Sequence, residues 1–209
     1  MSSQIEEPYP LVLGKVMFYA CAGDMPAVQG LTYRAEIPKS KLEDSPEHNW
    51  VETTYDGKEG SDVLAVPNHW HRDHDEIMEV LEGKMIFYLD GKEHPTSAGD
   101  PPITIPRGHI HGFTIIKGTY VRFIERTVPT GTFKALFFQD IFQRPGMPSF
   151  LMVMRAFYDG DAFPSLPGGF KWFDYLFITV VGFLAKAFVP GKPATVRRLG
   201  KRLDRGRCG

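Results

Sequence analysis

Cysteine is scarce in this chain, which excludes a small fold held together by disulfides. Only Cys21 and Cys208 occur, near opposite ends of the 209 residues, and two cysteines cannot form the framework of a small secreted domain. Glu6 and Glu7 stand where a secretory signal needs positive charge, and the first apolar run is three residues long. We therefore expect a reduced, cytoplasmic protein.

Several other features are missing. The sequence has no internal repeat, no low-complexity stretch and no glycine-rich phosphate loop. It also has no pattern of a DNA-binding helix-turn-helix, so no nucleic-acid partner is expected. The most apolar segment is free of charge only from Tyr175 to Ala185, which is shorter than the roughly 18 residues that a transmembrane helix needs.

The composition is that of a globular protein with one domain. Hydrophobic residues make up 43% and charged residues 23% of the chain, enough apolar surface for a stable core. The 21 glycines and 17 prolines favour many short strands joined by turns. We therefore expect a mainly β protein.

The pattern along the chain predicts four regions. Residues 1–62 contain two strands within 11–39 and a polar loop over 40–61, residues 63–130 form a dense series of short strands, residues 131–190 are helical, and residues 191–209 form a basic tail. Segments 133–143 and 149–158 show helical spacing. The tail holds seven Lys/Arg and one Asp, near +6, and the rest of the chain holds 17 basic and 24 acidic residues, near −7. A solvated tail is favoured over one that binds lipid or nucleic acid.

Residues 170–189 predict a helix that is apolar around most of its circumference. Asp174, Ile178, Gly182 and Lys186 lie four apart on a narrow face. We expect the helix to bury most of its surface against the β domain or in a homodimer. Peripheral membrane contact through residues 170–209 is the less favoured alternative, because Asp174 and Lys186 suit a bilayer core poorly.

Histidines mark the chemistry of the chain. Six of the seven lie between His69 and His111, and three of them occur in HWHRDHDE. Residues two apart in a strand point to the same side, so His69 and His71 can aim into one cavity while Trp70 faces away. Glu76 can add a carboxylate, and barrel closure can bring His109 or His111 to the same place. Several neutral imidazoles with one carboxylate suit a divalent transition metal.

At this point the sequence resembles the cupin superfamily. The spacing His69-x-His71-x4-Glu76-x6-Gly83 fills every fixed position of the first cupin motif. A small single-domain jelly-roll β-barrel with a helical C-terminal extension is the fold that the resemblance implies.

The second cupin motif is present with two departures. Gly99 is followed by Pro106-x-Gly108-x2-His111, with one extra residue before Pro106 and no Asn after the histidine. By this resemblance His69, His71, Glu76 and His111 are the ligands of one divalent metal ion. Fe or Mn is favoured, and Zn, Ni or Cu also suits the donors. His74 and His109 are interpreted as residues around the ligands.

The resemblance implies a metal-dependent enzyme that acts on a small organic molecule. The leading hypothesis is a dioxygenase-like oxidoreductase for an enol, phenol or keto acid. Glu76 would also act as a base, and His74 is a second candidate catalytic residue. A redox-neutral isomerase, decarboxylase or lyase is the first alternative, and a non-enzymatic small-molecule-binding cupin is the second.

Overall fold

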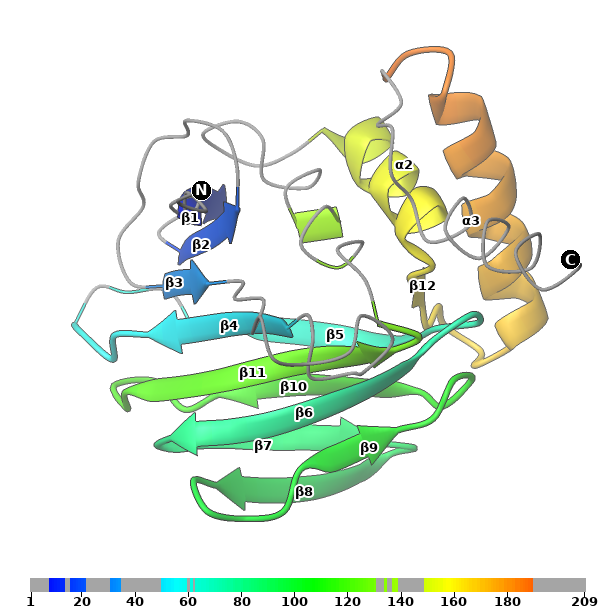
Figure 1. Cartoon of the computed structure of the whole chain (residues 1–209). Helices are drawn as coiled ribbons and strands as arrows, with labels where there is room; N and C mark the ends of the chain where they lie inside the picture. Colours follow the sequence, from blue (N-terminus) through cyan, green and yellow to red (C-terminus); the bar gives the residue numbers. More distant parts are fainter. Residues whose placement is uncertain are drawn as a thin grey trace, which may run out of the picture.

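Two antiparallel five-stranded sheets form the main body of the structure, a computed structural model (Figure 1). The described residues are 8–13, 16–21, 31–34, 50–59, 61, 63–130, 134, 137–138 and 149–189. Among these residues two helices follow the main series of strands, so the mainly β fold with a helical C-terminal extension is confirmed. The basic tail and most of the segment 133–143, expected to be helical, lie outside the described residues.

Strands of the two sheets largely alternate along the chain. The first has the order β12-β5-β10-β7-β8, with β5 (Ala65–Trp70), β7 (Lys84–Leu89), β8 (Lys92–Ser97), β10 (His111–Ile115) and β12 (Phe163–Pro164). The second has the order β3-β4-β11-β6-β9, with β3 (Leu31–Arg34), β4 (Trp50–Tyr55), β6 (Asp75–Glu82), β9 (Ile103–Ile105) and β11 (Val121–Val128). A separate hairpin pairs β1 (Pro8–Leu13) with β2 (Val16–Cys21).

The sequence analysis did not predict β1, β4, β8 or β12, and one predicted strand begins later than expected. Residues 40–61 were expected to be a polar loop, but Trp50–Tyr55 forms β4 with alternating burial. Its outward residues include Glu52 and Thr54, so the strand has little hydrophobic signal. The polar edge strand β8 is mostly exposed, as edge strands containing proline often are. The expected strand at 62–66 is β5, which starts at Ala65.

The core lies between the two sheets. Alternate residues of β6 and β11 point inward, including Met78, Val80 and Phe123, and meet Phe87 and Phe113 from the first sheet. No strand pairing among the described residues joins one sheet to the other. The domain is therefore a double-sheet jelly roll, and its inward faces hold both the core and the histidine motifs.

Two tight turns fix the register of the strands. Asp90 and Gly91 join β7 to β8 with φ values of 48° and 78°, the left-handed pair that a two-residue hairpin requires. At Gly83 φ is 76°, and a Cβ would lie 2.1 Å from the carbonyl oxygen of Tyr120. The glycine of the first motif is therefore required by backbone packing.

The C-terminal extension consists of α2 (Phe150–Gly160) and α3 (Lys171–Ala185), linked by β12. Ser149 caps α2, since its side chain accepts a hydrogen bond from the backbone N–H of Met152. The two helices pack side by side at one end of the sheets (Figure 1). Their close approach depends on Gly182, where a Cβ would lie 2.7 Å from the carbonyl oxygen of Met154.

The narrow stripe of α3 is the face that is buried. Asp174, Ile178, Gly182 and Ala185 are buried, whereas most of the large apolar side chains of this helix are exposed. The helix therefore does not bury most of its circumference against the β domain, and its burial in a homodimer stays a prediction. Within the described part of the chain, no helix is long and apolar enough to cross a membrane.

Gly182→Ala should destabilise the protein, although alanine is the better helix former by about 1 kcal/mol. The added methyl would lie 2.4 Å from Cβ of Tyr158, and overpacking of this kind costs about 1 to 3 kcal/mol. Val180→Ala on the exposed side of α3 is the control and should change the free energy of unfolding by less than about 0.5 kcal/mol. Urea denaturation measures both. A Gly182→Ala protein at least as stable as the original would contradict this packing.

Candidate metal centre

The structure brings together the four side chains that the motifs predict as ligands. His69 on β5 and His111 on β10 are directly opposed register partners within the first sheet. Glu76 projects inward from β6 of the second sheet, and His71 follows the end of β5. One potential ligand atom from each of the four lies within 4.8 Å of the others. The cluster therefore draws on both sheets.

Local strand geometry explains this convergence. On β6 the buried positions alternate, so Glu76 shares the inward face with Met78 and Val80. On β5 the ring of Trp70 turns the other way and stacks on Phe163, with ring centroids 4.6 Å apart. His71 was expected within the same strand as His69 but lies just beyond its end. The two imidazoles still meet, with centroids 4.9 Å apart.

Backbone carbonyls fix the three imidazole rings. Each Nδ1 lies within hydrogen-bond distance of a carbonyl oxygen: His69 to Pro67 at 2.9 Å, His71 to Asp161 at 2.7 Å, and His111 to His109 at 3.0 Å. A carbonyl can only accept, so a neutral ring that donates Nδ1–H to it keeps a lone pair on Nε2. His111 has a second acceptor, since its Nε2 is also within hydrogen-bond distance of Glu76, and it presents this lone pair when its proton lies on Nδ1. This arrangement is typical of histidines that bind metals.

The remaining ring nitrogens of His71 and His111 meet the carboxylate of Glu76. Nε2 of His71 lies 2.9 Å from Oε1, without hydrogen-bond geometry, and Nε2 of His111 lies 3.0 Å from Oε2. Lone pairs that face a carboxylate repel it unless a cation lies between them. The donors, their number and their convergence therefore fit a divalent transition metal ion.

Burial controls the charge of this cluster. It lowers the pKa of His71 to about 3 and the pKa of His69 well below its ordinary value, because a buried imidazolium loses its hydration. Burial would raise the pKa of Glu76, but the adjacent ammonium of Lys134 opposes that effect and helps to hold the pKa well below its usual range. Neutral imidazoles and an ionised carboxylate are the protonation states that bind metals.

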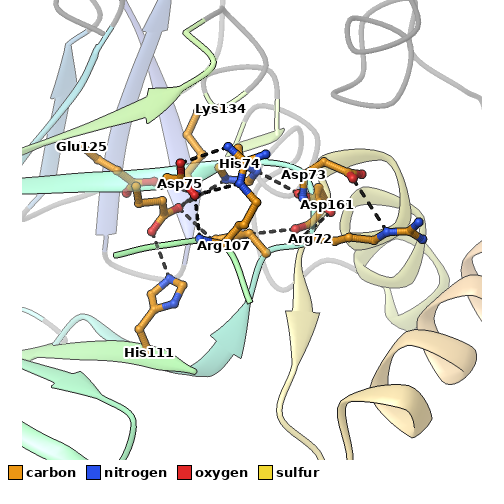
Figure 2. Close-up of polar contacts among 11 residues, drawn as sticks. Arg72, Asp73, His74, Asp75, Arg107, His111, Glu125, Lys134 and Asp161 are labelled. Carbon is orange, nitrogen blue, oxygen red and sulfur yellow. Dashed lines mark hydrogen bonds and ion pairs between the residues drawn. The ribbon is translucent and has the colours of Figure 1, made fainter. Parts of the chain in front are cut away.

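A buried lysine also reaches the cluster, and the sequence analysis missed it. Nζ of Lys134 contacts Oε1 of Glu76. It also lies 2.7 Å from Oε1 of Glu125 (Figure 2). Glu125 lies on the inward face of β11. The alternation of inward and outward residues along that strand could therefore have identified Glu125 as a buried carboxylate. Lys134 stands between Phe133 and Ala135 in an apolar segment, which was a weaker signal.

His74 lies beside the four residues and is fully buried. Its Nδ1 is 2.9 Å from Oδ2 of Asp161, and its Nε2 is 3.7 Å from Oε1 of Glu76 (Figure 2). With Nδ1–H donated to Asp161, Nε2 faces Glu76 as an acceptor. His71, His74 and Asp161 form a second group whose donor atoms lie within 4.8 Å of one another. His109, in contrast, is exposed and pairs with Asp90 at the rim.

Asp161 connects the helical extension to the site, and no sequence motif marked it. It ends α2 in the left-handed conformation, with φ of 59° and ψ of 37°. Its carboxylate accepts the backbone N–H groups of Arg72 at 3.2 Å and Asp73 at 2.7 Å, and its carbonyl oxygen accepts from His71. One residue thus fixes the loop 71–74 and two of its imidazole rings.

Comparison with known proteins agrees with this description. Residues 62–125 match the Cupin domain family, and no curated protein matches the chain. Among solved structures, KdgF from Halomonas sp. is 20% identical with a TM-score of 0.35, covering 49% of this chain and 81% of that chain. The polyketide cyclase RemF from Streptomyces resistomycificus is 22% identical with a TM-score of 0.39, covering 61% and 79%.

The fold and the cluster define a double-sheet protein with a site able to hold a metal ion. The family match spans both histidine motifs and most of the two sheets. The match to the Cupin domain family covers 64 of the 209 residues, and these include the four converging side chains.

Acid should destabilise the metal-free protein through His71. Its pKa falls from 6.5 in the unfolded chain to about 3 in the folded protein, so below pH 6.5 the unfolded chain binds a proton that the folded protein does not. The contribution of His71 to the free energy of unfolding is fully present above pH 6.5. It falls by about 1.4 kcal/mol per pH unit as the pH drops towards 3. Urea denaturation with chelator at about pH 7 and about pH 5 measures the slope. His71→Gln should reduce it by that amount, and an unchanged slope would contradict the assignment.

Proposed function

We propose that the chain is a metal-dependent cupin enzyme that acts on a small organic molecule. The observation that carries the proposal is the convergence of three Nε2 lone pairs and one carboxylate, each imidazole being fixed by a backbone carbonyl at Nδ1. His69, His71, Glu76 and His111 would hold the ion. Fe or Mn is favoured, and Zn, Ni or Cu also suits the donors.

Residues around the four ligands would supply a positive charge and a proton acceptor for the reaction. When bound, the ion supplies Lewis acidity, and Fe or Mn adds a route for electrons to dioxygen. The ammonium of Lys134, buried beside Glu76, would stabilise negative charge that develops on a substrate oxygen. His74 would accept a proton at Nε2, and Asp161 at its Nδ1 would stabilise the resulting imidazolium.

Two reaction classes fit this arrangement. The first is a dioxygenase-like oxidation of an enol, phenol or keto acid. The second is a redox-neutral isomerisation, decarboxylation or elimination through an enolate. Lys134 and His74 favour the second, because a buried cation and a histidine paired with a carboxylate are the groups that enolate chemistry uses. In both classes Glu76 remains a candidate base, although its contact with Lys134 must first open.

The reaction class should be decided by following oxygen and substrate together. Protein loaded with Fe, Mn or Zn is mixed with a panel of small phenols, enols and keto acids, while an electrode records oxygen and chromatography records the organic molecule. Oxygen uptake equal to substrate loss identifies the oxidoreductase, and substrate loss without uptake identifies the redox-neutral enzyme. Binding of panel compounds without turnover would contradict the proposal and indicate a binding module.

His111→Ala should weaken metal binding by more than about 100-fold, because it removes a donor atom from the centre of the cluster. His109→Ala is the matched control, since this neighbouring histidine is exposed and pairs with Asp90 at the rim. Calorimetric titration with Mn²⁺ and elemental analysis of the purified proteins measure the effect.

The fold should survive both changes, because the apolar core between the sheets contains neither histidine. Circular dichroism checks this. Normal metal content in His111→Ala, or equal losses in the two variants, would contradict the ligand assignment.

A further inference from the structure

The exposed side of α3 carries a continuous apolar surface. Of the eleven large hydrophobic residues that are exposed in the described part of the chain, eight lie between residues 170 and 188. We call these eight the apolar face: Phe170, Trp172, Phe173, Leu176, Val180, Phe183, Leu184 and Phe188. Exposed apolar patches of this kind mark interaction surfaces.

No carboxylate lies on this face. Asp174 is the only acidic residue of α3, and its side chain is 0% exposed. It accepts hydrogen bonds from Nε1 of Trp70 at 3.1 Å and from the backbone N–H of Leu166 at 3.0 Å. In the sequence analysis the charge of Asp174 counted against contact with lipid. In the structure this carboxylate points into the protein and away from the apolar face.

Positive charge flanks the apolar face. Lys171 and Lys186 lie at the two ends of α3, and both are exposed. Residues 191–209, which follow directly, hold seven Lys/Arg and one Asp. From residue 175 to residue 203 the sequence has no acidic residue. The apolar face thus has a lysine at each end of its helix, and a basic segment follows it in the sequence.

We propose that α3 and the basic segment after it bind the surface of an anionic lipid bilayer, with the helix lying in the interface. Aromatic residues stand near both ends of the face, and Leu176 and Val180 stand between them. Aromatic rings suit the level of the lipid headgroups, and lysines at helix ends can reach phosphates. Stable peripheral binding takes two signals, an apolar insertion and a polybasic patch, and this chain has both.

A second copy of the chain fits this surface less well. A two-fold interface places the same face against itself, so two sets of basic residues would meet where α3 offers no exposed carboxylate. An anionic bilayer supplies the missing negative charge. The proposal is independent of the proposed enzymatic function, and its test needs neither metal nor substrate.

The test uses full-length protein with phosphatidylcholine vesicles that contain or lack phosphatidylserine. Cosedimentation should occur with the anionic vesicles and be lost at high salt. Trp172 is 67% exposed and Trp70 only 7%, so insertion should shift the tryptophan emission to shorter wavelength, and Trp172→Phe should remove that shift. The double variant Phe173→Gln with Phe183→Gln should bind at least about tenfold more weakly.

Phe150→Gln is the matched control, because Phe150 is 60% exposed at the start of α2 and lies outside the apolar face. It should bind like the original protein, whereas Arg197→Ser with Arg198→Ser should bind anionic vesicles more weakly. Equal binding to neutral and anionic vesicles would overturn the proposal. Absence of vesicle binding, with a dimer in sedimentation equilibrium that the phenylalanine double variant converts to monomer, would overturn it in favour of self-association.

Discussion

The site depends on one electrostatic constraint, the meeting of three imidazole lone pairs with an ionised carboxylate in a buried space. When the carbonyl oxygens of residues 67, 109 and 161 accept the Nδ1–H groups of the three rings, their Nε2 lone pairs are left to bind an ion. Glu76 has its positive partner in Lys134. A divalent ion at the centre of the donors would remove the remaining repulsion, and binding such an ion would therefore also stabilise the fold.

The C-terminal extension takes part in the same arrangement. Strand β12 pairs with β5 beside His69, and Asp161 reaches the loop 71–74 with both its carbonyl oxygen and its carboxylate. The left-handed conformation at Asp161 allows both groups to face that loop while the residue closes α2. The extension is thus attached beside the site, and changes in its packing will reach His71 and His74 through Asp161.

The sequence contained enough to predict the four converging residues but not their surroundings. His69, Glu76 and His111 lie in strands and His71 lies just beyond the end of β5, so strand periodicity turned their spacing into direction, and the cupin resemblance chose His111 over His109. Lys134 and Asp161 come from segments whose position depends on tertiary packing, which no local pattern encodes. Strands β4 and β8 were missed for a related reason. Their outward positions are polar, and β8 lies at a sheet edge, so cross-strand hydrogen bonds define them more than hydrophobicity does.

Helix α3 shows why hydrophobic content alone does not decide which face of a helix is buried. Close packing on α2 needs the missing side chain of Gly182, since a Cβ there would collide with Tyr158 and Met154. Asp174 lies two turns earlier on the same face and binds Trp70 and Leu166. A buried carboxylate with two donors stays satisfied without water, so a charged residue can belong to the inner face. Because Asp174 and Gly182 fix the orientation of the helix, most of its large apolar side chains lie on the outer face, where a nonaqueous partner can cover them.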